Sequence, residues 1–190
     1  MNMARAIAAV GLALATFAPA GQALRVRGLD GQMHEPLRVA PGSTHLLFFV
    51  ATDCPISNRY APEIGRIVAE YAPRHVSSFL IYADSRATEA HVRAHVAEFW
   101  PTGIGARIIL DEALAVTRGA GATVTPEAAV YTPAGRVYRG RIDDLYIKLG
   151  ETRRAPTRRD LRVSLDAVVA GLRVPVAETQ AVGCYIQQTK

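Results

Sequence analysis

The chain has 190 residues, of which 49% are hydrophobic and 21% are charged. These proportions are those of an ordinary globular protein, and they exclude a disordered chain and a collagen-like one. The length predicts one domain, which can bury roughly 70% of the surface that its unfolded chain exposes.

The formal net charge is +5, from 22 basic and 17 acidic residues. Only Lys148 and Lys190 are lysines, and the arginines are scattered apart from one dense run, between 153 and 159. No aromatic residue interleaves with that run, as a groove for single-stranded nucleic acid requires. We therefore interpret the run as solvated surface and expect no nucleic-acid partner.

Residues 1–23 have the pattern of a secretory signal peptide. Arg5 precedes an uncharged stretch, Ala6 to Ala15, and small residues follow up to Ala23. The apolar stretch is short for roughly 30 Å of hydrocarbon, which favours a cleaved signal over a membrane anchor. We predict cleavage after Ala23, with Ala20 as the alternative. The sequence thus predicts export to an oxidising compartment such as the bacterial periplasm, with no membrane association after cleavage.

Residues 24–175 are predicted to form one domain and residues 176–190 a C-terminal tail. Residues 45–50 are a continuous apolar run, typical of a strand that is buried on both faces of a sheet. From Pro55 to Tyr71 apolar residues recur every three or four positions, which predicts a helix, with a kink caused by Pro62. The following elements are predicted as strand 76–83, helix 88–100, strand 106–110, helix 111–118, strands 127–131 and 136–141, and helix 157–170. This order predicts an α/β fold with a central mixed sheet, helices on both faces and a terminal antiparallel hairpin.

Cys54 lies where the first buried strand ends and the first long helix begins. The unpaired N–H groups and the positive dipole at a helix N-terminus stabilise a thiolate, so this position favours a reactive cysteine. The alternative is an inert cysteine that packs in the core. Ser57 stands where a second cysteine would complete a redox motif; it can donate a hydrogen bond to the thiolate but cannot resolve a mixed disulfide.

The run from Thr52 to Asn58, the loop Val124-Thr125-Pro126 before a hairpin, and the run from Tyr138 to Asp144 together resemble the thioredoxin-like superfamily. The resemblance is to exported redoxin proteins related to alkyl hydroperoxide reductase and the thiol-specific antioxidant proteins, and it covers residues 37–172. It implies a thioredoxin-like fold and a thiol oxidoreductase that acts on disulfides or peroxides.

The resemblance also implies roles for individual residues. Pro126 would be a cis-proline facing Cys54, and the backbone of Thr125 would pair with an extended thiol substrate. Arg141 would support a thiolate or a bound anion, with an ion-pair role as the alternative for it and for Glu127. Hydrogen bonds around the thiolate would come from Thr52, Ser57 and Asn58.

Two departures from the family bear on the substrate. Peroxiredoxins carry a threonine three residues before the reactive cysteine and a proline four residues before that threonine, whereas this chain has Ala51 and Leu47 there. The sequence therefore favours a disulfide over a peroxide as the substrate. Disulfide reductases of the superfamily use two cysteines in one loop, whereas this chain has only Cys54 in that loop.

The second cysteine, Cys184, lies in the tail and follows Gly183, which permits a close approach to another surface. Three interpretations stay open: Cys184 resolves an intermediate formed on Cys54, the two form a structural disulfide, or Cys184 is a free or intermolecular thiol. The expected partners are a protein thiol or disulfide, or a small peroxide, as substrate, and a separate redox partner protein.

No cofactor or metal site is predicted. His91 and His95 are one helical turn apart but are interpreted as solvated, and Asp143 and Asp144 are interpreted as a turn or cap. A hypothesis of another class is a non-catalytic binding module, in which the two cysteines form a static disulfide or bind a soft metal.

Overall fold

The computed structural model describes residues 23–187; apart from Ala23, the predicted signal peptide lies outside them. A five-stranded mixed sheet forms the centre of the fold, in the order β5–β4–β3–β7–β8. β3, β4 and β5 are parallel, and β7 is antiparallel to both of its neighbours, β3 and β8. The strands are β3 (Thr44–Val50), β4 (Val76–Tyr82), β5 (Arg107–Leu110), β7 (Glu127–Thr132) and β8 (Gly135–Gly140). The predicted mixed sheet with its antiparallel hairpin is confirmed.

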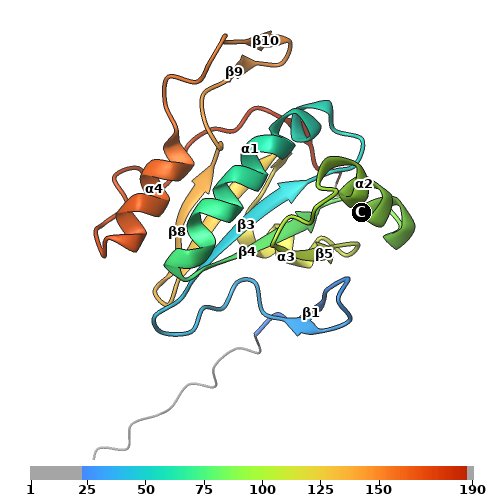
Figure 1. The fold of residues 1–190 in the computed structure, drawn as a ribbon, viewed down its shortest axis with the longest axis horizontal. Helices are drawn as coiled ribbons and strands as arrows, with labels where there is room; N and C mark the ends of the chain where they lie inside the picture. The colour runs from blue at the N-terminus through green and yellow to red at the C-terminus, as the bar shows by residue number, and fades with distance from the viewer. Residues whose placement is uncertain (1–22, 188–190) are drawn as a thin grey trace, which may run out of the picture.

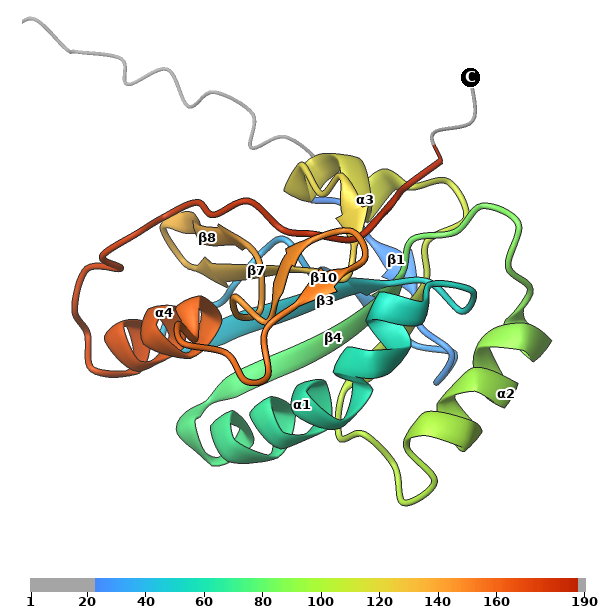
Figure 2. The same ribbon diagram turned by 90° about the horizontal axis from the view of Figure 1, so that it is seen from above.

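Helices cover both faces of this sheet, as Figures 1 and 2 show. α1 (Pro55–Tyr71), α2 (Glu89–Phe99) and α4 (Asp160–Val169) pack on one face. α3 (Ala115–Ala120) and the chain around the hairpin β1 (Val26–Arg27) and β2 (Met33–His34) pack on the other. α1 continues through Pro62 and is followed by the 3-10 turn η1 (Ala72–Arg74).

β3 contributes to two hydrophobic cores, because successive side chains of a strand point to opposite faces of the sheet. Leu46 and Phe48 pack in the core beneath α1, α2 and α4. Leu47 and Phe49 pack in the core beneath α3. The uninterrupted apolar run in the sequence therefore has a physical cause: both faces of β3 are covered.

Two helices begin later than the sequence predicts, and in both cases an aspartate explains the delay. The carboxylate of Asp111 accepts hydrogen bonds from the backbone N–H groups of Val116 and Thr117, so the chain turns once before α3 begins at Ala115. Asp144 likewise accepts hydrogen bonds from the backbone N–H groups at 157 and 158, and α4 begins at Asp160 instead of 157. α3 also ends two residues later than predicted, at Ala120.

Two further pairs of short strands have no counterpart in the predicted elements. β9 (Tyr146–Lys148) and β10 (Glu151–Thr152) form a hairpin between β8 and α4. β6 (Val124–Thr125) pairs with β11 (Cys184–Tyr185), at the end of the C-terminal tail. Figure 2 shows the tail passing β8 on its way from α4 to this pairing.

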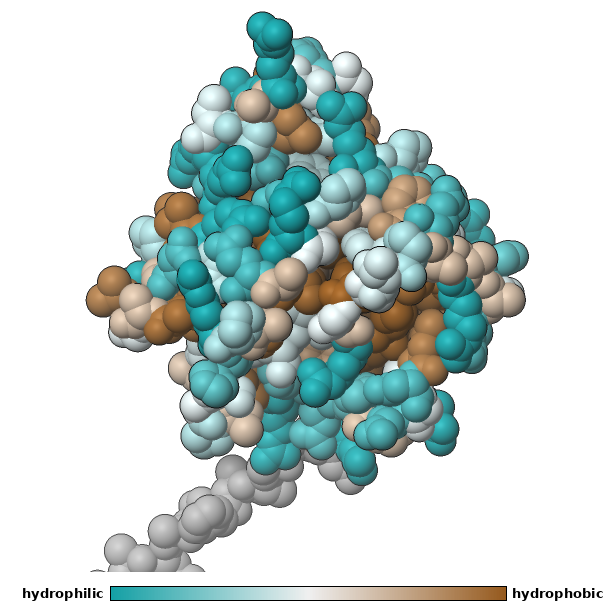
Figure 3. Space-filling model, viewed as in Figure 1, coloured by the Kyte–Doolittle hydropathy of each residue, from teal (hydrophilic) through white to brown (hydrophobic). Residues whose placement is uncertain are grey.

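The face of the molecule shown in Figure 3 is mostly hydrophilic, with apolar side chains gathered in its middle. Within residues 23–187, no helix combines the length and the apolar character that crossing a bilayer requires.

Candidate active site: a cysteine pair at the start of α1

Cys54 is the N-cap residue of α1. Its backbone is extended, with φ −91° and ψ 106°, and its Sγ accepts a hydrogen bond from the backbone N–H of Ser57 at 3.4 Å. The side chain is fully buried, with 0% of its surface exposed. Strand β3 and helix α1 thus hold the sulfur at the positive end of the helix dipole, where a thiolate is stabilised.

Cys184 reaches Cys54 through the pairing of β11 with β6. Cys184 lies opposite Thr125 in the antiparallel register, and the N–H of Ile186 donates to the carbonyl of Thr123 at 3.0 Å. The two sulfurs lie 2.8 Å apart and are not bonded to each other. The tail therefore brings together two cysteines that are 130 positions apart in the sequence.

Gly183 permits this approach. A Cβ atom at this position would lie 2.2 Å from the carbonyl oxygen of Thr125 and 2.7 Å from its carbonyl carbon. Both are backbone atoms, which cannot rotate aside as the end of a long side chain can. Any other residue at position 183 would push the tail, and Cys184 with it, away from β6.

The tail is anchored a second time at residues 177–179, and Thr179 lies five residues before Cys184. Residues 177–179 form backbone hydrogen bonds with Arg139 on β8, and the hydroxyl of Thr179 accepts from the N–H of Arg141 at 3.1 Å. The phenol of Tyr138 lies 2.7 Å from the same hydroxyl. Residues 180–183 span the distance between the two anchors, so the position of Cys184 depends on both.

The loop between β6 and β7 faces the cysteine pair. The peptide bond between Thr125 and Pro126 is cis, as the family resemblance implies. The carbonyl oxygen of Thr125 lies 3.0 Å from the Sγ of Cys54 and accepts a hydrogen bond from it when the thiol is neutral. Glu127, only 3% exposed, accepts hydrogen bonds from the N–H groups of Thr123 and Val124 and so fixes the shape of the loop.

The two thiols differ in acidity. Burial raises the pKa of Cys54, but contacts with the side chains of Cys184 and Thr125 and with Ser57, whose backbone N–H donates to the sulfur, outweigh burial and place that pKa below its usual value. Burial, together with the hydrogen bond and the charge that Cys54 presents, raises the pKa of Cys184 to about 12. In the reduced pair Cys54 is therefore the sulfur that ionises, and Cys184 keeps its proton.

Ser57 acts on Cys54 directly. Its backbone N–H donates to the Sγ of Cys54, and its buried side chain, whose hydroxyl has no hydrogen-bond partner among residues 23–187, also lowers the pKa of Cys54. Thr52 contributes its backbone carbonyl, which accepts a hydrogen bond from the side-chain amide of Asn58 at 3.4 Å. Thr52 and Asn58 therefore support the loop that carries Cys54.

His95 is part of this support, which corrects its interpretation as a solvated helix-face histidine. The side chain of His95 is buried, because α2 packs over the start of α1. The hydroxyl of Tyr82 donates to its Nδ1 at 2.8 Å, and its Nε2 donates to the side-chain oxygen of Asn58 at 2.9 Å. A chain of hydrogen bonds thus runs from Tyr82 through His95 and Asn58 to Thr52.

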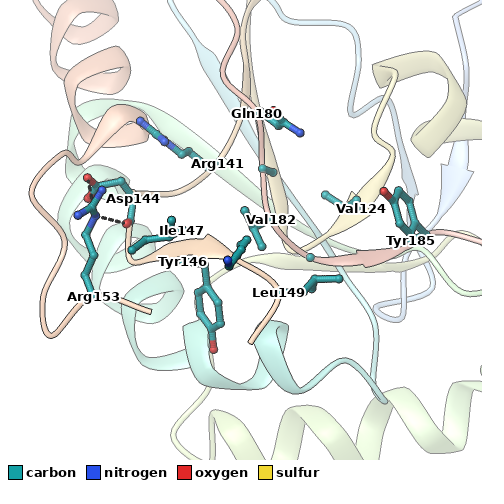
Figure 4. Close-up of a pocket in the computed structure, with 13 residues that line it drawn as sticks. Val124, Arg141, Asp144, Tyr146, Ile147, Leu149, Arg153, Gln180, Val182 and Tyr185 are labelled. Atoms are coloured by element: carbon teal, nitrogen blue, oxygen red, sulfur yellow. Dashed lines mark hydrogen bonds and ion pairs between the residues drawn. The ribbon is translucent and has the colours of Figure 1, made fainter. Parts of the chain in front are cut away.

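Arg141 forms an ion pair with Asp160 at 2.7 Å, the role that the sequence gives as its alternative. It also lines a pocket of about 620 Å³ between the tail and the β9–β10 hairpin, shown in Figure 4. Gly183 and Tyr185, the neighbours of Cys184, line the same pocket. Its wall on the hairpin side includes the ion pair of Asp144 with Arg153.

The two adjacent aspartates are buried and each has a structural role. Asp143 accepts a hydrogen bond from the phenol of Tyr60 at 2.5 Å, and Asp144 holds the turn that leads to α4, in agreement with their interpretation as a turn or cap. No group of three or more His, Cys, Asp or Glu side chains arranged for a metal ion occurs within residues 23–187.

Comparison with protein families gives one match: the Redoxin family model covers residues 18–138. The chain belongs to the Redoxin family. Comparison with curated proteins gives no match.

Solved structures with the same fold are distant in sequence. A hypothetical protein from Sinorhizobium meliloti 1021 is 24% identical, with a TM-score of 0.71 over 87% of this chain and 91% of its own. An uncharacterised conserved protein from Geobacillus kaustophilus is 22% identical, with a TM-score of 0.73 over 88% and 90%. A secreted disulfide oxidoreductase from Mycobacterium tuberculosis is 18% identical, with a TM-score of 0.50 over 79% and 96%. These likenesses establish the thioredoxin-like fold.

Proposed function

We propose that this protein is a thiol–disulfide oxidoreductase in which Cys54 is the nucleophile and Cys184 the resolving cysteine. The observation that carries the proposal is the 2.8 Å contact between the two sulfurs, one of them at the N-terminus of α1. Membership of the Redoxin family and the low pKa of Cys54 support it.

In the first step the Cys54 thiolate attacks one sulfur of a substrate disulfide. A bond forms between Cys54 and that sulfur, the substrate S–S bond breaks, and the other substrate sulfur leaves as a thiolate. Since Cys54 is buried behind the tail, residues 180–187 have to move aside for this step. Thr125, left free on the edge of β6, then pairs with the incoming substrate.

In the second step Cys184 loses its proton to the departed thiolate or to water and attacks the sulfur of Cys54. The mixed disulfide breaks, the bound substrate sulfur leaves as a thiolate, and an internal Cys54–Cys184 disulfide remains. The substrate gains two electrons and the cysteine pair loses them. Burial is the largest cause of the high pKa of Cys184, and the charge on Cys54 adds to it; once the first substrate sulfur is bound, Cys54 carries no negative charge, so this second cause is removed and the pKa of Cys184 falls.

The test is a time course on the reduced, purified chain with oxidised glutathione, followed by mass spectrometry and peptide mapping. We expect the internal disulfide to form and to be readily reduced by dithiothreitol. Cys184→Ser should stop the reaction at a glutathione mixed disulfide on Cys54, and Cys54→Ser should leave Cys184 largely unmodified at neutral pH.

The competing hypothesis is a static disulfide in a non-catalytic module. An internal bond that resists millimolar dithiothreitol in the folded protein would establish that hypothesis and refute ours. A reduced pair that does not react with oxidised glutathione would also refute ours. The same time course with one equivalent of hydrogen peroxide tests the less favoured substrate class, for which Ala51 lacks the family's threonine hydroxyl.

We also propose that the protein works in an oxidising compartment, the bacterial periplasm, after cleavage behind Ala23. The proposal rests on the sequence of residues 1–23. The intact mass of the protein recovered from a periplasmic extract tests it: a chain beginning at Leu24 supports cleavage at this site, whereas the full-length mass in a membrane fraction contradicts it.

A further inference from the structure

The two sulfurs of the pair differ in how far solvent reaches them. Cys54 is fully buried, whereas Cys184 is partly exposed and its neighbour Tyr185 is 77% exposed. Cys184 also lines a cavity of about 340 Å³, together with Asp53, Thr125 and other residues of the surrounding loops. Cys54 is not among the residues that line this cavity.

This difference matters most in the oxidised state. Thiol–disulfide exchange requires the incoming thiolate to reach one of the two bonded sulfurs. The tail covers Cys54, and in the oxidised protein the disulfide itself holds the tail there. A reductant therefore meets Cys184 first, because the movement that would uncover Cys54 is blocked until the bond is broken.

The chemistry of the leaving group favours the same sulfur. Attack on Cys184 expels Cys54, whose pKa is lowered at the start of α1, whereas attack on Cys54 would expel Cys184, whose pKa is raised by burial even after Cys54 has lost its charge. A thiol of lower pKa leaves faster. Solvent access and leaving-group chemistry thus both favour attack of the reductant on Cys184.

We propose that the dithiol reductant that regenerates this protein attacks Cys184, so that the C-terminal tail carries the intermediate formed with the recycling partner. The inference rests on the function proposed above and assigns the two half-reactions to different sulfurs: substrates react at Cys54, and the reductant reacts at Cys184.

A thiolate of the reductant bonds to the Sγ of Cys184, the Cys54–Cys184 bond breaks, and its electron pair leaves on the Sγ of Cys54. The second thiol of the reductant then loses its proton and attacks the reductant's own bound sulfur. This attack releases Cys184, which takes up a proton. The reductant ends as a disulfide, and the cysteine pair is reduced by two electrons.

The tail can carry such an intermediate because its end is held lightly. β11 has two residues, and past Gly183 the tail is held by its pairing with β6, by the bond from Ile186 to Thr123, and by the partly buried side chains of Cys184 and Ile186 at the edges of the two cores. The anchor at Thr179 is independent of this pairing. Residues 180–187 can therefore swing outward with a bound partner while the tail stays attached to β8.

The direct test uses the oxidised chain and 2-mercaptoethanol, a neutral monothiol that stops at the mixed disulfide. After a pulse of seconds, acid quench and alkylation with N-ethylmaleimide, peptide mapping locates the mercaptoethanol adduct. We expect it on Cys184, with Cys54 alkylated. An adduct on Cys54 with Cys184 alkylated would overturn the inference. Absence of the internal disulfide before the pulse would instead mean that the proposed function has failed, and this inference with it.

A second measurement tests whether the reductant reaches Cys184 through the cavity of about 340 Å³. Arg86 lines the cavity and lies near the carboxylates of Asp53 and Asp84. Arg86→Glu makes the cavity more negative and should slow reduction by glutathione, whose thiolate form is anionic, about threefold or more at low ionic strength. Reduction by 2-mercaptoethanol should slow less. Arg66→Glu, on the exposed side of α1, is the matched control; equal effects of the two variants on the glutathione rate would rule out this route.

Discussion

Replacing Gly183 by alanine tests whether the close approach of the tail sets the rate of resolution. The added methyl group would lie 2.2 Å from the oxygen and 2.7 Å from the carbon of the Thr125 carbonyl. Non-bonded heavy atoms prefer roughly 3.5 Å or more, so the tail has to retreat by about 1 Å. Cys184 then loses its contact with Cys54, because β11 moves as one short strand.

Two estimates of the effect agree. A misplacement of about 1 Å can cost about 100-fold in rate when two groups must meet. Alternatively, β11 detaches and loses two backbone hydrogen bonds, each worth about 1 kcal/mol, which lowers the population of the closed tail about 30-fold. We therefore expect Gly183→Ala to slow formation of the internal disulfide by about 30- to 100-fold.

The assay follows the reduced protein with excess oxidised glutathione by quenched-flow mass spectrometry. Wild type should pass through the Cys54–glutathione species without accumulating it, whereas Gly183→Ala should accumulate it. Val182→Ala is the control, because it trims the neighbouring side chain and adds no atom near Thr125. If Gly183→Ala resolves within about threefold of wild type while its melting temperature is unchanged, the tail does not need the contact, and the reasoning is wrong.

Two further predictions concern the surroundings of Cys54. Ser57→Ala removes a hydroxyl that lowers the pKa of Cys54, so the midpoint of the pH profile for alkylation of Cys54 should move upward. Ser78→Ala removes another buried hydroxyl that has no hydrogen-bond partner within residues 23–187, and it should leave the midpoint unchanged. Burial lowers the pKa of His95 from 6.5, so the unfolded chain binds a proton at this residue more readily than the folded chain does. The contribution of His95 to stability is therefore fully present above pH 6.5 and is lost as the pH falls below that value. The free energy of unfolding, measured with urea, should decrease by up to about 1 kcal/mol from this residue between pH 7.5 and 5.5, and His95→Gln should flatten that slope; an equal slope in the variant would contradict the assignment.

The elements that the sequence predicts well are those whose signal is local. The apolar run of β3 and the periodicity of α1 each reflect a face buried along its whole length. The sequence also locates Cys54 at the helix N-terminus, because the apolar run of β3 ends just before it and the helical periodicity of α1 begins just after it. The starts of α3 and α4 are missed because Asp111 and Asp144 hold the turns that precede these helices, and hydrogen bonds of this kind leave no mark in the periodicity.

The parts of the site that the sequence does not predict depend on contacts between distant segments. His95 forms hydrogen bonds with Tyr82, on β4, and with Asn58, on α1. No spacing of residues within α2 indicates these two partners. The position of Cys184 follows from pairing with a two-residue strand, which is too short to leave a pattern in composition or periodicity. For this reason the three interpretations of Cys184 stay open in the sequence, and the contact with Cys54 comes only from the fold.

Thr179 offers a test of whether the anchor on β8 contributes to the redox step that takes place at β6. Its hydroxyl accepts from the N–H of Arg141 and donates to the phenol of Tyr138, which in turn donates to the carbonyl of Arg141 at 2.6 Å. Thr179→Val keeps the shape of the side chain but leaves a backbone N–H without its partner, at a cost of about 1–3 kcal/mol.

The free energy lost in Thr179→Val weakens the attachment of the tail, because the broken hydrogen bonds join the tail to the end of β8. Hydrogen exchange of residues 177–186 should accelerate in Thr179→Val while exchange in β3 and β4 stays slow, and formation of the internal disulfide should slow about tenfold or more. Thr179→Ser, which retains the hydroxyl, should restore both. Faster exchange with an unchanged rate of disulfide formation would mean that the pairing of β11 with β6 alone positions Cys184. Rescue by serine together with a slowed valine variant would mean that the resolving cysteine is positioned from both ends of the 180–183 span.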